Sequence, residues 1–221
     1  MKRIFGVVLA MVIMLQTMAF IMPLTANAET YTNQSRELMT RGNKIVYKDD
    51  PKAVIRLTGM NVPGGEWTGT PSVEKLERSV KEAIFRWNAN LIRLPVSVEG
   101  WYGTYNYVND GGRGYRNYMD NIINIVAAEG RYVVLDLHHY KSFNKQQYLD
   151  FWKEAAEKYG NNPAVLFGIL NEPHSTTWEV WRNGDGGNIT GHQQVVEMIR
   201  DLGARNIIVA GGLDYAYRID D

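Results

Sequence analysis

The stretch Leu166-Phe167-Gly168-Ile169-Leu170-Asn171-Glu172-Pro173-His174 changes from apolar to polar between two neighbouring residues. Its apolar part has the length of a strand that is buried on both faces, as in a parallel sheet covered by helices. Ligands of such folds bind at the carboxyl ends of the strands, so Asn171 and Glu172 stand where chemistry is expected. A simpler interpretation is that these residues only end the strand, because proline cannot continue a ladder and polar residues favour turns.

Around this stretch, segments with strand character alternate with segments of helical spacing. Five strands are predicted, at residues 54–61, 90–96, 131–138, 164–170 and 206–210. A hairpin between residues 44–47 and 53–58 is predicted to lead into the first of them. Four helices are predicted between the strands: one opening at Thr70-Pro71, one at 115–128, one capped by Asn144, and one capped by Thr190 with Gln193. This order implies right-handed crossovers and a parallel α/β sheet, either open and doubly wound or part of an eight-stranded barrel.

The other strand ends also carry polar residues. Arg93 lies inside the apolar run 91–95, and a buried arginine needs a carboxylate or hydrogen-bond acceptors beside it. In Asp136-Leu137-His138-His139-Tyr140, strand alternation places Asp136, His138 and Tyr140 on one face and His139 on the other. The adjacent histidines are therefore poor joint metal ligands, and no metal site or cofactor is expected. Pro63-Gly64-Gly65 is too short a glycine pattern to predict a phosphate loop.

The N-terminus has the pattern of a secretory signal peptide over residues 1–28. Basic residues Lys2 and Arg3 precede an apolar stretch, and Ala26-Asn27-Ala28 resembles a cleavage site. An uncleaved membrane anchor is the alternative, but Gln16, Thr17 and Pro23 interrupt the run that would have to cross a bilayer. We therefore expect a secreted, extracellular protein whose mature chain, residues 29–221, forms one domain.

Charge and cysteine content exclude several classes of function. Removing Lys2 and Arg3 leaves 24 − 2 = 22 basic side chains against 24 acidic ones, a net charge of −2. This balance gives no electrostatic basis for binding nucleic acid or, after signal cleavage, a membrane. The chain contains no cysteine, which excludes disulfides, thiolate metal sites and cysteine nucleophiles.

Four short motifs then occur in a recognisable order: Gly59-Met60-Asn61, Leu91-Ile92-Arg93-Leu94-Pro95, Leu135-Asp136-Leu137-His138 and Leu170-Asn171-Glu172-Pro173. In these motifs the chain resembles glycoside hydrolase family 5, the cellulase-like retaining glycosidases, over essentially all of its mature length. The resemblance implies a (β/α)8 TIM barrel. It also implies that Glu172 is the general acid/base, that Asn171 binds a sugar 2-hydroxyl, that Arg93 organises the carboxylates and that His138 binds sugar in the adjacent subsite.

Hydrolysis of an acetal by this route needs two carboxyl groups, one to protonate the departing oxygen and one to attack or stabilise the anomeric carbon. We expect Arg93 to lie closer to the second carboxylate than to Glu172. The family's nucleophile is a glutamate at the end of the seventh strand, whereas the fifth predicted strand is the last in this sequence. The barrel is therefore expected to be truncated after that strand, without a nucleophile and inactive by itself.

Three other acidic residues could replace the nucleophile, but each has a simpler interpretation. Asp136 is expected to be a structural partner for nearby donors, Glu99 an exposed loop charge and Asp214 a turn former.

Aromatic residues in the loops after the strands favour a sugar polymer as substrate, because their faces can stack on pyranose rings. The candidate substrate-binding residues are His139, Tyr140, Trp67, Trp101, Tyr102 and Trp178. Ordinary loop packing is the alternative for each of these rings. The sequence thus predicts a secreted retaining glycosidase acting on a β-linked polysaccharide, with an endo-β-1,4-glucanase favoured. The alternative function is that of a non-catalytic carbohydrate-binding remnant of such an enzyme.

Overall fold

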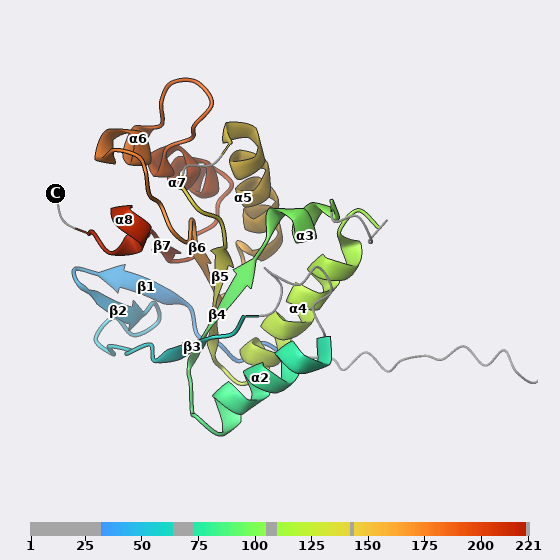
Figure 1. Cartoon of the computed structure of the whole chain (residues 1–221). Helices are drawn as coiled ribbons and strands as arrows, with labels where there is room; N and C mark the ends of the chain where they lie inside the picture. The colour runs from blue at the N-terminus through green and yellow to red at the C-terminus, as the bar shows by residue number, and fades with distance from the viewer. Residues whose placement is uncertain (1–31, 64–72, 105–109, 142–143, 220–221) are drawn as a thin grey trace, which may run out of the picture. The chain divides into compact units, whose positions relative to one another are not determined.

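The structure is a computed structural model that describes residues 32–63, 73–104, 110–141 and 144–219 (Figure 1). The predicted signal peptide, the predicted helix start at Thr70-Pro71 and the candidate Trp67 lie outside these described residues. Within the described ranges, none of the helices combines the length and the apolar character that a membrane crossing requires.

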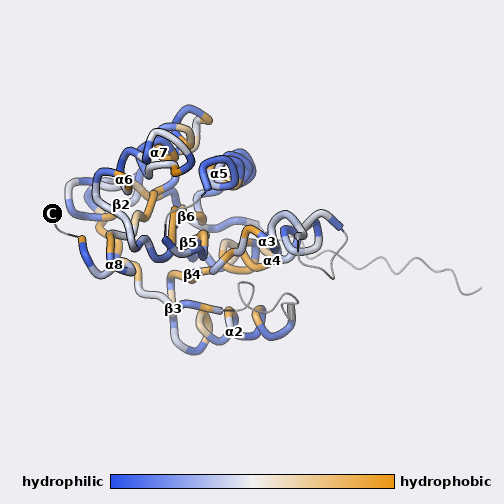
Figure 2. The backbone as a smooth tube through the Cα atoms, turned by 45° about the horizontal axis from the view of Figure 1, so that its top comes forward, coloured by the Kyte–Doolittle hydropathy of each residue, from blue (hydrophilic) through white to orange (hydrophobic). Residues whose placement is uncertain are grey.

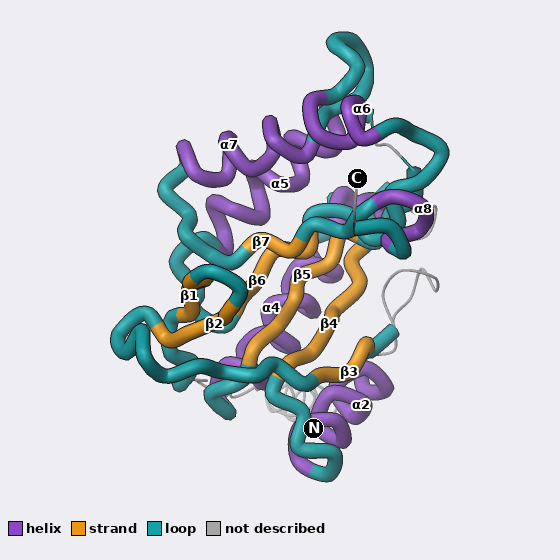
Figure 3. Tube along the Cα trace, turned by 90° about the vertical axis from the view of Figure 1, so that its left-hand side faces the viewer, coloured by secondary structure: helices purple, strands orange, loops and turns teal. Residues whose placement is uncertain are grey.

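Five parallel strands form the main sheet, and each pairs with the next one along the chain. They are β3 (Gly59–Asn61), β4 (Leu91–Val96), β5 (Tyr132–Leu137), β6 (Val165–Gly168) and β7 (Ile208–Val209). The long helices lie on one side of this sheet (Figure 3): α2 (Val73–Phe85), α4 (Arg113–Ala128), α5 (Lys145–Tyr159) and α7 (His192–Asp201). A doubly wound sheet would carry helices on both faces and reverse its strand order, so the arrangement is that of a barrel wall. The predicted parallel α/β fold is confirmed.

Strand alternation divides the core into two parts, most clearly along β5. Val133, Leu135 and Leu137 are fully buried and pack in the cluster beneath the helices. Tyr132 and Val134 belong to a second cluster on the opposite face, together with Leu38. Figure 2 shows apolar colour on parts of the central strands, whereas α5 is mostly polar in colour. Asp136 follows Val134 by two residues, so it shares the face that is not covered by the helices.

A hairpin packs against the N-terminal part of that second face. It consists of β1 (Leu38–Arg41) and β2 (Lys44–Tyr47), which run antiparallel around a turn where Gly42 has a φ of 60°. The predicted pairing of residues 44–47 with 53–58 is wrong in its main part, because β2 forms its regular pairs with β1. What remains of the predicted pairing is a bridge between Val46 and Val54 and two backbone hydrogen bonds, from Ile55 N to Ile45 O and from Tyr47 N to Ala53 O. Gly42 supplies the positive φ that a short hairpin turn requires. The turn of the hairpin therefore lies before β2, between β1 and β2, and not after β2 as predicted.

The predicted N-terminal cap is correct for helix α5 and wrong for helix α7. Asn144 caps α5 as predicted, and its side chain accepts hydrogen bonds from the backbone of Gln146 and Gln147. The predicted cap of α7 at Thr190 is wrong by one residue. Gly191 is the N-cap, and its amide donates to the side chain of Gln194 at 3.2 Å, whereas the Thr190 hydroxyl donates to the Lys145 carbonyl.

Three short helices were not predicted: α3 (Val98–Tyr102), α6 (Trp178–Asn183) and α8 (Leu213–Ala216). Each is too short to show a helical period in the sequence. The first strand is also shorter than predicted, since regular pairing in β3 begins only at Gly59.

Candidate active site

The polar residues of the sequence motifs meet at the carboxyl ends of the parallel strands. Strand register aligns Asn61 with Arg93, Pro95 with Asp136, and Asp136 with Gly168. Arg93 is paired with Val134 and therefore projects from the same face of the sheet as Val134. Asp136 follows Val134 by two residues along β5, so its side chain lies on this face as well. The sheet thus brings residues from β3, β4, β5 and β6 to one place, as the strand-end pattern predicted.

Arg93 is the centre of the hydrogen-bond network at this edge. Its Nη1 donates to Asn61 Oδ1 at 2.7 Å, and its Nη2 donates to Asn171 Oδ1 at 2.5 Å. The same Nη2 forms an ion pair with Asp136 Oδ2 at 2.8 Å. A guanidinium presents several donors in one plane, which suits it to hold three acceptors at once. The acidic partner of Arg93 is therefore Asp136 and not Glu172.

Asp136 also orients a histidine. Its Oδ2 lies 2.9 Å from His138 Nδ1, and Asp136 itself is only 3% exposed. A buried carboxylate needs such partners because transfer from water is costly when a charge is left alone. In the neutral ring this contact keeps the proton on Nδ1 and leaves Nε2 as an acceptor. Asp136 is thus a structural partner for nearby donors, as the sequence interpretation held.

Gly168 in β6 makes room for this arrangement. A Cβ at this position would lie 2.9 Å from Val134 Cγ1 and 3.4 Å from Asp136 Oδ1. Sequence reasoning did not single out this residue, although a glycine inside an apolar strand is a signal of close backbone approach.

Beyond β6 the backbone continues beside the end of β5 and carries the two polar residues of the opening motif. Asn171 N donates to Leu137 O at 3.0 Å, and Glu172 N donates to His139 O at 3.2 Å. Asn171 Nδ2 is buried and makes no hydrogen bond within the described residues, so it is a donor available to a ligand hydroxyl. The half-buried Glu172 side chain forms no ion pair or hydrogen bond with the described part of the chain. The site therefore holds one satisfied carboxylate, Asp136, and one that is chemically available.

His139 and Tyr140 extend the site along the same edge. Both are half-buried, and the Tyr140 ring centroid lies 6.0 Å from that of His138 and 6.4 Å from that of His139. Burial lowers the pKa of His139 below its usual value, and the charge of Glu99 opposes this shift in part. His139 is thereby kept as a neutral ring beside the site.

The prediction that Trp101 stacks on substrate is wrong. Its side chain is 0% exposed, its ring lies edge-on to Phe151 at 5.1 Å, and its Nε1 donates to Glu154 Oε2 at 2.8 Å. The unpredicted helix α3, capped by the Ser97 side chain, turns residue 101 into the core instead of leaving it in a loop. Tyr102 is half-buried against the same core, and burial raises the pKa of its hydroxyl.

Trp178 is half-buried at the start of α6. Its ring lies edge-on to Trp181 with 5.3 Å between centroids, and the Arg218 guanidinium lies 5.9 Å from its ring centre. Sugar contact by Trp178 stays a prediction, as does that of Trp67, which lies outside the described residues.

The two other candidate carboxylates, Glu99 and Asp214, both lie in short helices that the sequence did not predict. Glu99 is exposed, on helix α3 instead of the expected loop. Asp214 lies in the short turn α8 with a φ of 51°, and its Oδ2 forms an ion pair with Arg218 Nη1 at 3.7 Å, in agreement with the predicted turn role. Over residues 32–63, 73–104, 110–141 and 144–219, no three histidine, aspartate or glutamate side chains converge as a metal ligand set.

Comparison with known proteins gives a consistent result. The family model described as cellulase (glycosyl hydrolase family 5) matches residues 47–221. The cellulase CelDZ1 of a Thermoanaerobacterium species is 27% identical over 175 residues, which cover 75% of this chain and 43% of that protein. The manganese dependent endoglucanase Eg5A of Phanerodontia chrysosporium is 27% identical over 194 residues, covering 74% of this chain and 45% of its own length. The chain thus spans a little under half the length of these curated relatives.

Solved structures show the same fold. The catalytic domain of the Thermobifida fusca endoglucanase Cel5A (E5) superposes with a TM-score of 0.62 at 21% identity, covering 81% of this chain and 55% of that one. The β-glucanase SdGluc5_26A from Saccharophagus degradans gives a TM-score of 0.66 at 20% identity, with 86% and 57% covered. A variant of the Thermobifida enzyme was solved in complex with cellotetraose. The five-stranded sheet is therefore part of a TIM barrel.

Proposed function

Because the chain belongs to the cellulase family, glycosyl hydrolase family 5, we propose that it carries the acid/base half of a secreted retaining glycosidase acting on a β-linked glucan. Two of its relatives are endoglucanases, which favours internal β-1,4 bonds of cellulose as the target.

The observation that carries this proposal is the contrast between the two strand-end carboxylates. Asp136 is held by Arg93 and His138, whereas Glu172 has no such partner among the described residues. A general acid must exchange its proton with the departing oxygen, and a carboxyl group already bound to a cation is poorly suited to that role. Glu172 is therefore the proton donor, and Asp136 is a positioning residue for its neighbours.

The residues around Glu172 have matching roles toward sugar. Asn171 Nδ2 is a buried donor without a protein partner in the described ranges, and it would bind a hydroxyl of the sugar ring beside the cleaved bond. Arg93 fixes the amide of Asn171 by donating to its Oδ1. His138, whose Nδ1 lies 2.9 Å from Asp136 Oδ2, would bind sugar in the adjacent subsite. A neutral amide such as that of Asn171 binds hydroxyls without altering the charge at Glu172.

The nucleophile is the remaining requirement. Asp136 is bound in the network, Glu99 is exposed on α3 and Asp214 belongs to the α8 turn. We therefore propose that the nucleophilic carboxylate comes from a segment outside this sequence, and that residues 29–221 alone bind β-glucan without cleaving it.

Calorimetric titration of purified residues 29–221 with cellotetraose tests this proposal. We expect measurable binding, weakened about fivefold or more in Asn171→Ala because loss of a ligand hydrogen bond costs about 1 kcal/mol. Asn161→Ala, which alters an exposed amide away from the strand ends, is the matched control and should bind as the parent does. Release of reducing sugar from β-glucan should be undetectable.

Two outcomes would contradict the proposal. If the parent chain and Asn171→Ala both fail to bind cellotetraose while their thermal unfolding is normal, the proposed carbohydrate-binding site is refuted. If the parent chain cleaves β-glucan and Glu172→Gln abolishes the cleavage, a nucleophile is present within residues 29–221.

A non-catalytic carbohydrate-binding role is the second candidate, and the lack of a second available carboxylate among the described strand ends favours it. The DNA beyond the codon for Asp221 separates the two functions. A continuing frame that encodes a strand ending in glutamate supports the glycosidase, whereas a stop codon together with retained cellotetraose affinity supports the binding role.

A further inference from the structure

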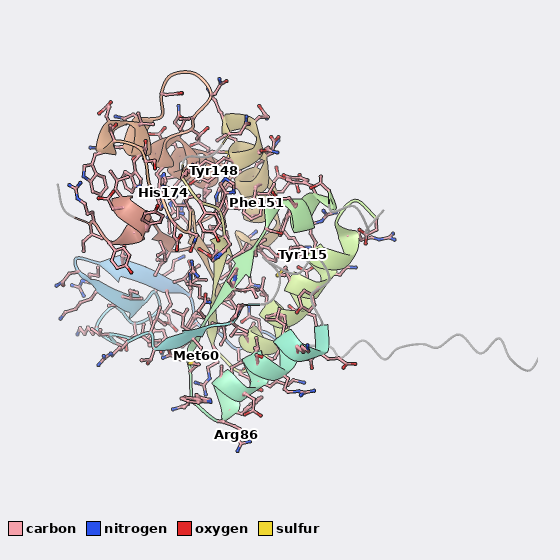
Figure 4. All side chains as sticks on the ribbon, in the orientation of Figure 1. Met60, Arg86, Tyr115, Tyr148, Phe151 and His174 are labelled. Atoms are coloured by element: carbon pink, nitrogen blue, oxygen red, sulfur yellow. The ribbon has the colours of Figure 1, made fainter. Side chains whose placement is uncertain are left out.

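A buried histidine lies outside the catalytic network, between two aromatic rings. His192 is the first residue of α7 and is 5% exposed. Its ring stacks on Trp181 of α6, with 4.5 Å between centroids and an interplanar angle of 28°. On the α5 side its centroid lies 6.2 Å from that of Tyr148, at 60°. Figure 4 labels Tyr148 and shows it among the side chains around α5, α6 and α7. We call Tyr148, His192 and Trp181 the aromatic stack.

Neither ring nitrogen of His192 has a hydrogen-bond partner within the described residues. Burial lowers the pKa of His192 to about 4, and the nearby Trp181 carbonyl, which lies outside hydrogen-bond geometry, opposes this only in part. The titratable groups that line the small cavity beside the ring are Lys141, from the segment after β5, and Tyr148, from α5. Neither supplies a negative charge at neutral pH. His192 is therefore a neutral aromatic plate above pH 5.

The aromatic stack is connected to the catalytic strand end through Trp181. Its Nε1 donates to the Gly211 carbonyl at 2.9 Å. Gly211 in turn lies against the segment that follows β6, because a Cβ there would be 3.5 Å from Leu170 O and 3.6 Å from Asn171 O. Trp181 also supports Trp178 edge-on, at 5.3 Å. A shift of Trp181 would therefore reach both the Asn171 backbone and a candidate sugar-binding ring.

We propose that His192 is a positioning residue for the carbohydrate site: its neutral ring holds Trp181 in place behind Asn171 and Trp178, and its protonation in acid loosens carbohydrate binding. The inference rests on the proposed function, since it concerns the same site.

The direction of the pH effect follows from the two states of the ring. In the unfolded chain His192 titrates near its ordinary pKa of 6.5, and in the folded chain near 4. Between these values the unfolded state binds more protons. The contribution of His192 to stability is therefore fully present above pH 6.5 and is lost as the pH falls toward 4. At pH 4 about half of the folded molecules carry the charged ring.

The test uses a Glu172→Gln parent of the full chain, which removes the titration of the acid/base residue. At pH 7, His192→Phe in this parent keeps an aromatic plate and should bind cellotetraose within twofold of the parent. His192→Ala removes the plate and should weaken binding severalfold. From pH 7 to pH 4 the affinity of the parent for cellotetraose should fall about twofold more than that of the His192→Phe variant. The reason is that about half of the parent molecules carry a protonated His192 at pH 4 and would not bind. The melting temperature of the parent should also fall more over this range.

The outcomes separate this inference from the proposed function. Equal cellotetraose affinities of His192→Phe and His192→Ala at pH 7, or identical pH profiles of parent and His192→Phe, would overturn the positioning role. Absence of cellotetraose binding by the folded Glu172→Gln parent would instead refute the proposed function, while the melting profiles would still report the titration of His192.

Discussion

At the residue scale, Asp136 determines how the strand-end groups are arranged. One carboxylate oxygen, Oδ2, contacts both Arg93 and His138, at 2.8 Å and 2.9 Å. Arg93 then uses its remaining donors on Asn61 and Asn171, so a single buried acid sets the position of four neighbours. Removing one partner of a buried pair leaves the other charge without compensation.

Asp136→Asn should lower the free energy of unfolding by about 2 to 4 kcal/mol at pH 7, because Arg93 loses its counter-charge in a site of low exposure. Urea unfolding followed by tryptophan fluorescence measures this change. Asp201→Asn is the matched control, since Asp201 is an exposed acid at the end of α7, and it should change stability by less than about 0.5 kcal/mol. Equal effects of the two substitutions would show that the Asp136 network does not stabilise the fold.

At the element scale, the close packing of β6 against β5 leaves room for Asp136 to pair with Arg93 at the carboxyl ends of the strands. Gly168 is the residue of β6 that faces Asp136 across the strand pair. Helix α3 shows the same dependence on local elements, because it directs Trp101 inward and removes it from the set of possible sugar platforms.

Gly168→Ala should destabilise the chain by about 1 to 3 kcal/mol, since its Cβ would lie 2.9 Å from Val134 Cγ1 in a packed sheet. Gly187→Ala is the control, because the atom nearest to its Cβ is Asp185 Oδ1 at 3.5 Å. The control should shift stability by no more than about 0.5 kcal/mol. Differential scanning calorimetry of the two variants gives the comparison, and a Gly168→Ala protein as stable as the parent would contradict the packing argument.

At the scale of the whole molecule, the described sheet pairs in the order β3-β4-β5-β6-β7, so β3 and β7 each have one described neighbour. Apolar side chains are exposed near both edges, including Phe85 at the end of α2 and Val209 in β7. The match to the Thermobifida enzyme covers 81% of this chain but only 55% of that chain, so that structure extends well beyond the matched part. A barrel closes by pairing its first and last strands, which removes such edges.

Export is also a property of the whole chain. We expect expression of the complete reading frame in a secreting host to release protein into the medium with a mature N-terminus near Glu29, because residues 1–28 have the three parts of a signal peptide. N-terminal sequencing of the released protein measures this. A protein that begins at Met1 or Lys2 would show that the segment is not cleaved.

The sequence by itself determined the order of the five main strands and of the long helices between them, the parallel sheet and the strand ends that carry Arg93, Asp136, Asn171 and Glu172. Hydrophobic periodicity and the polar residues that end each strand are local properties, and they are readable without knowing what lies across the sheet. Tertiary structure alone decided that Asp136 is the partner of Arg93, that β2 pairs with β1, that Trp101 is buried and that His192 lies beneath Trp181. These outcomes depend on register and on side-chain packing between residues far apart in the chain, as in the hydrogen bond between Arg93 and Asn171, which are 78 positions apart. Such contacts follow from the geometry of the assembled sheet and leave no periodic signal in the sequence.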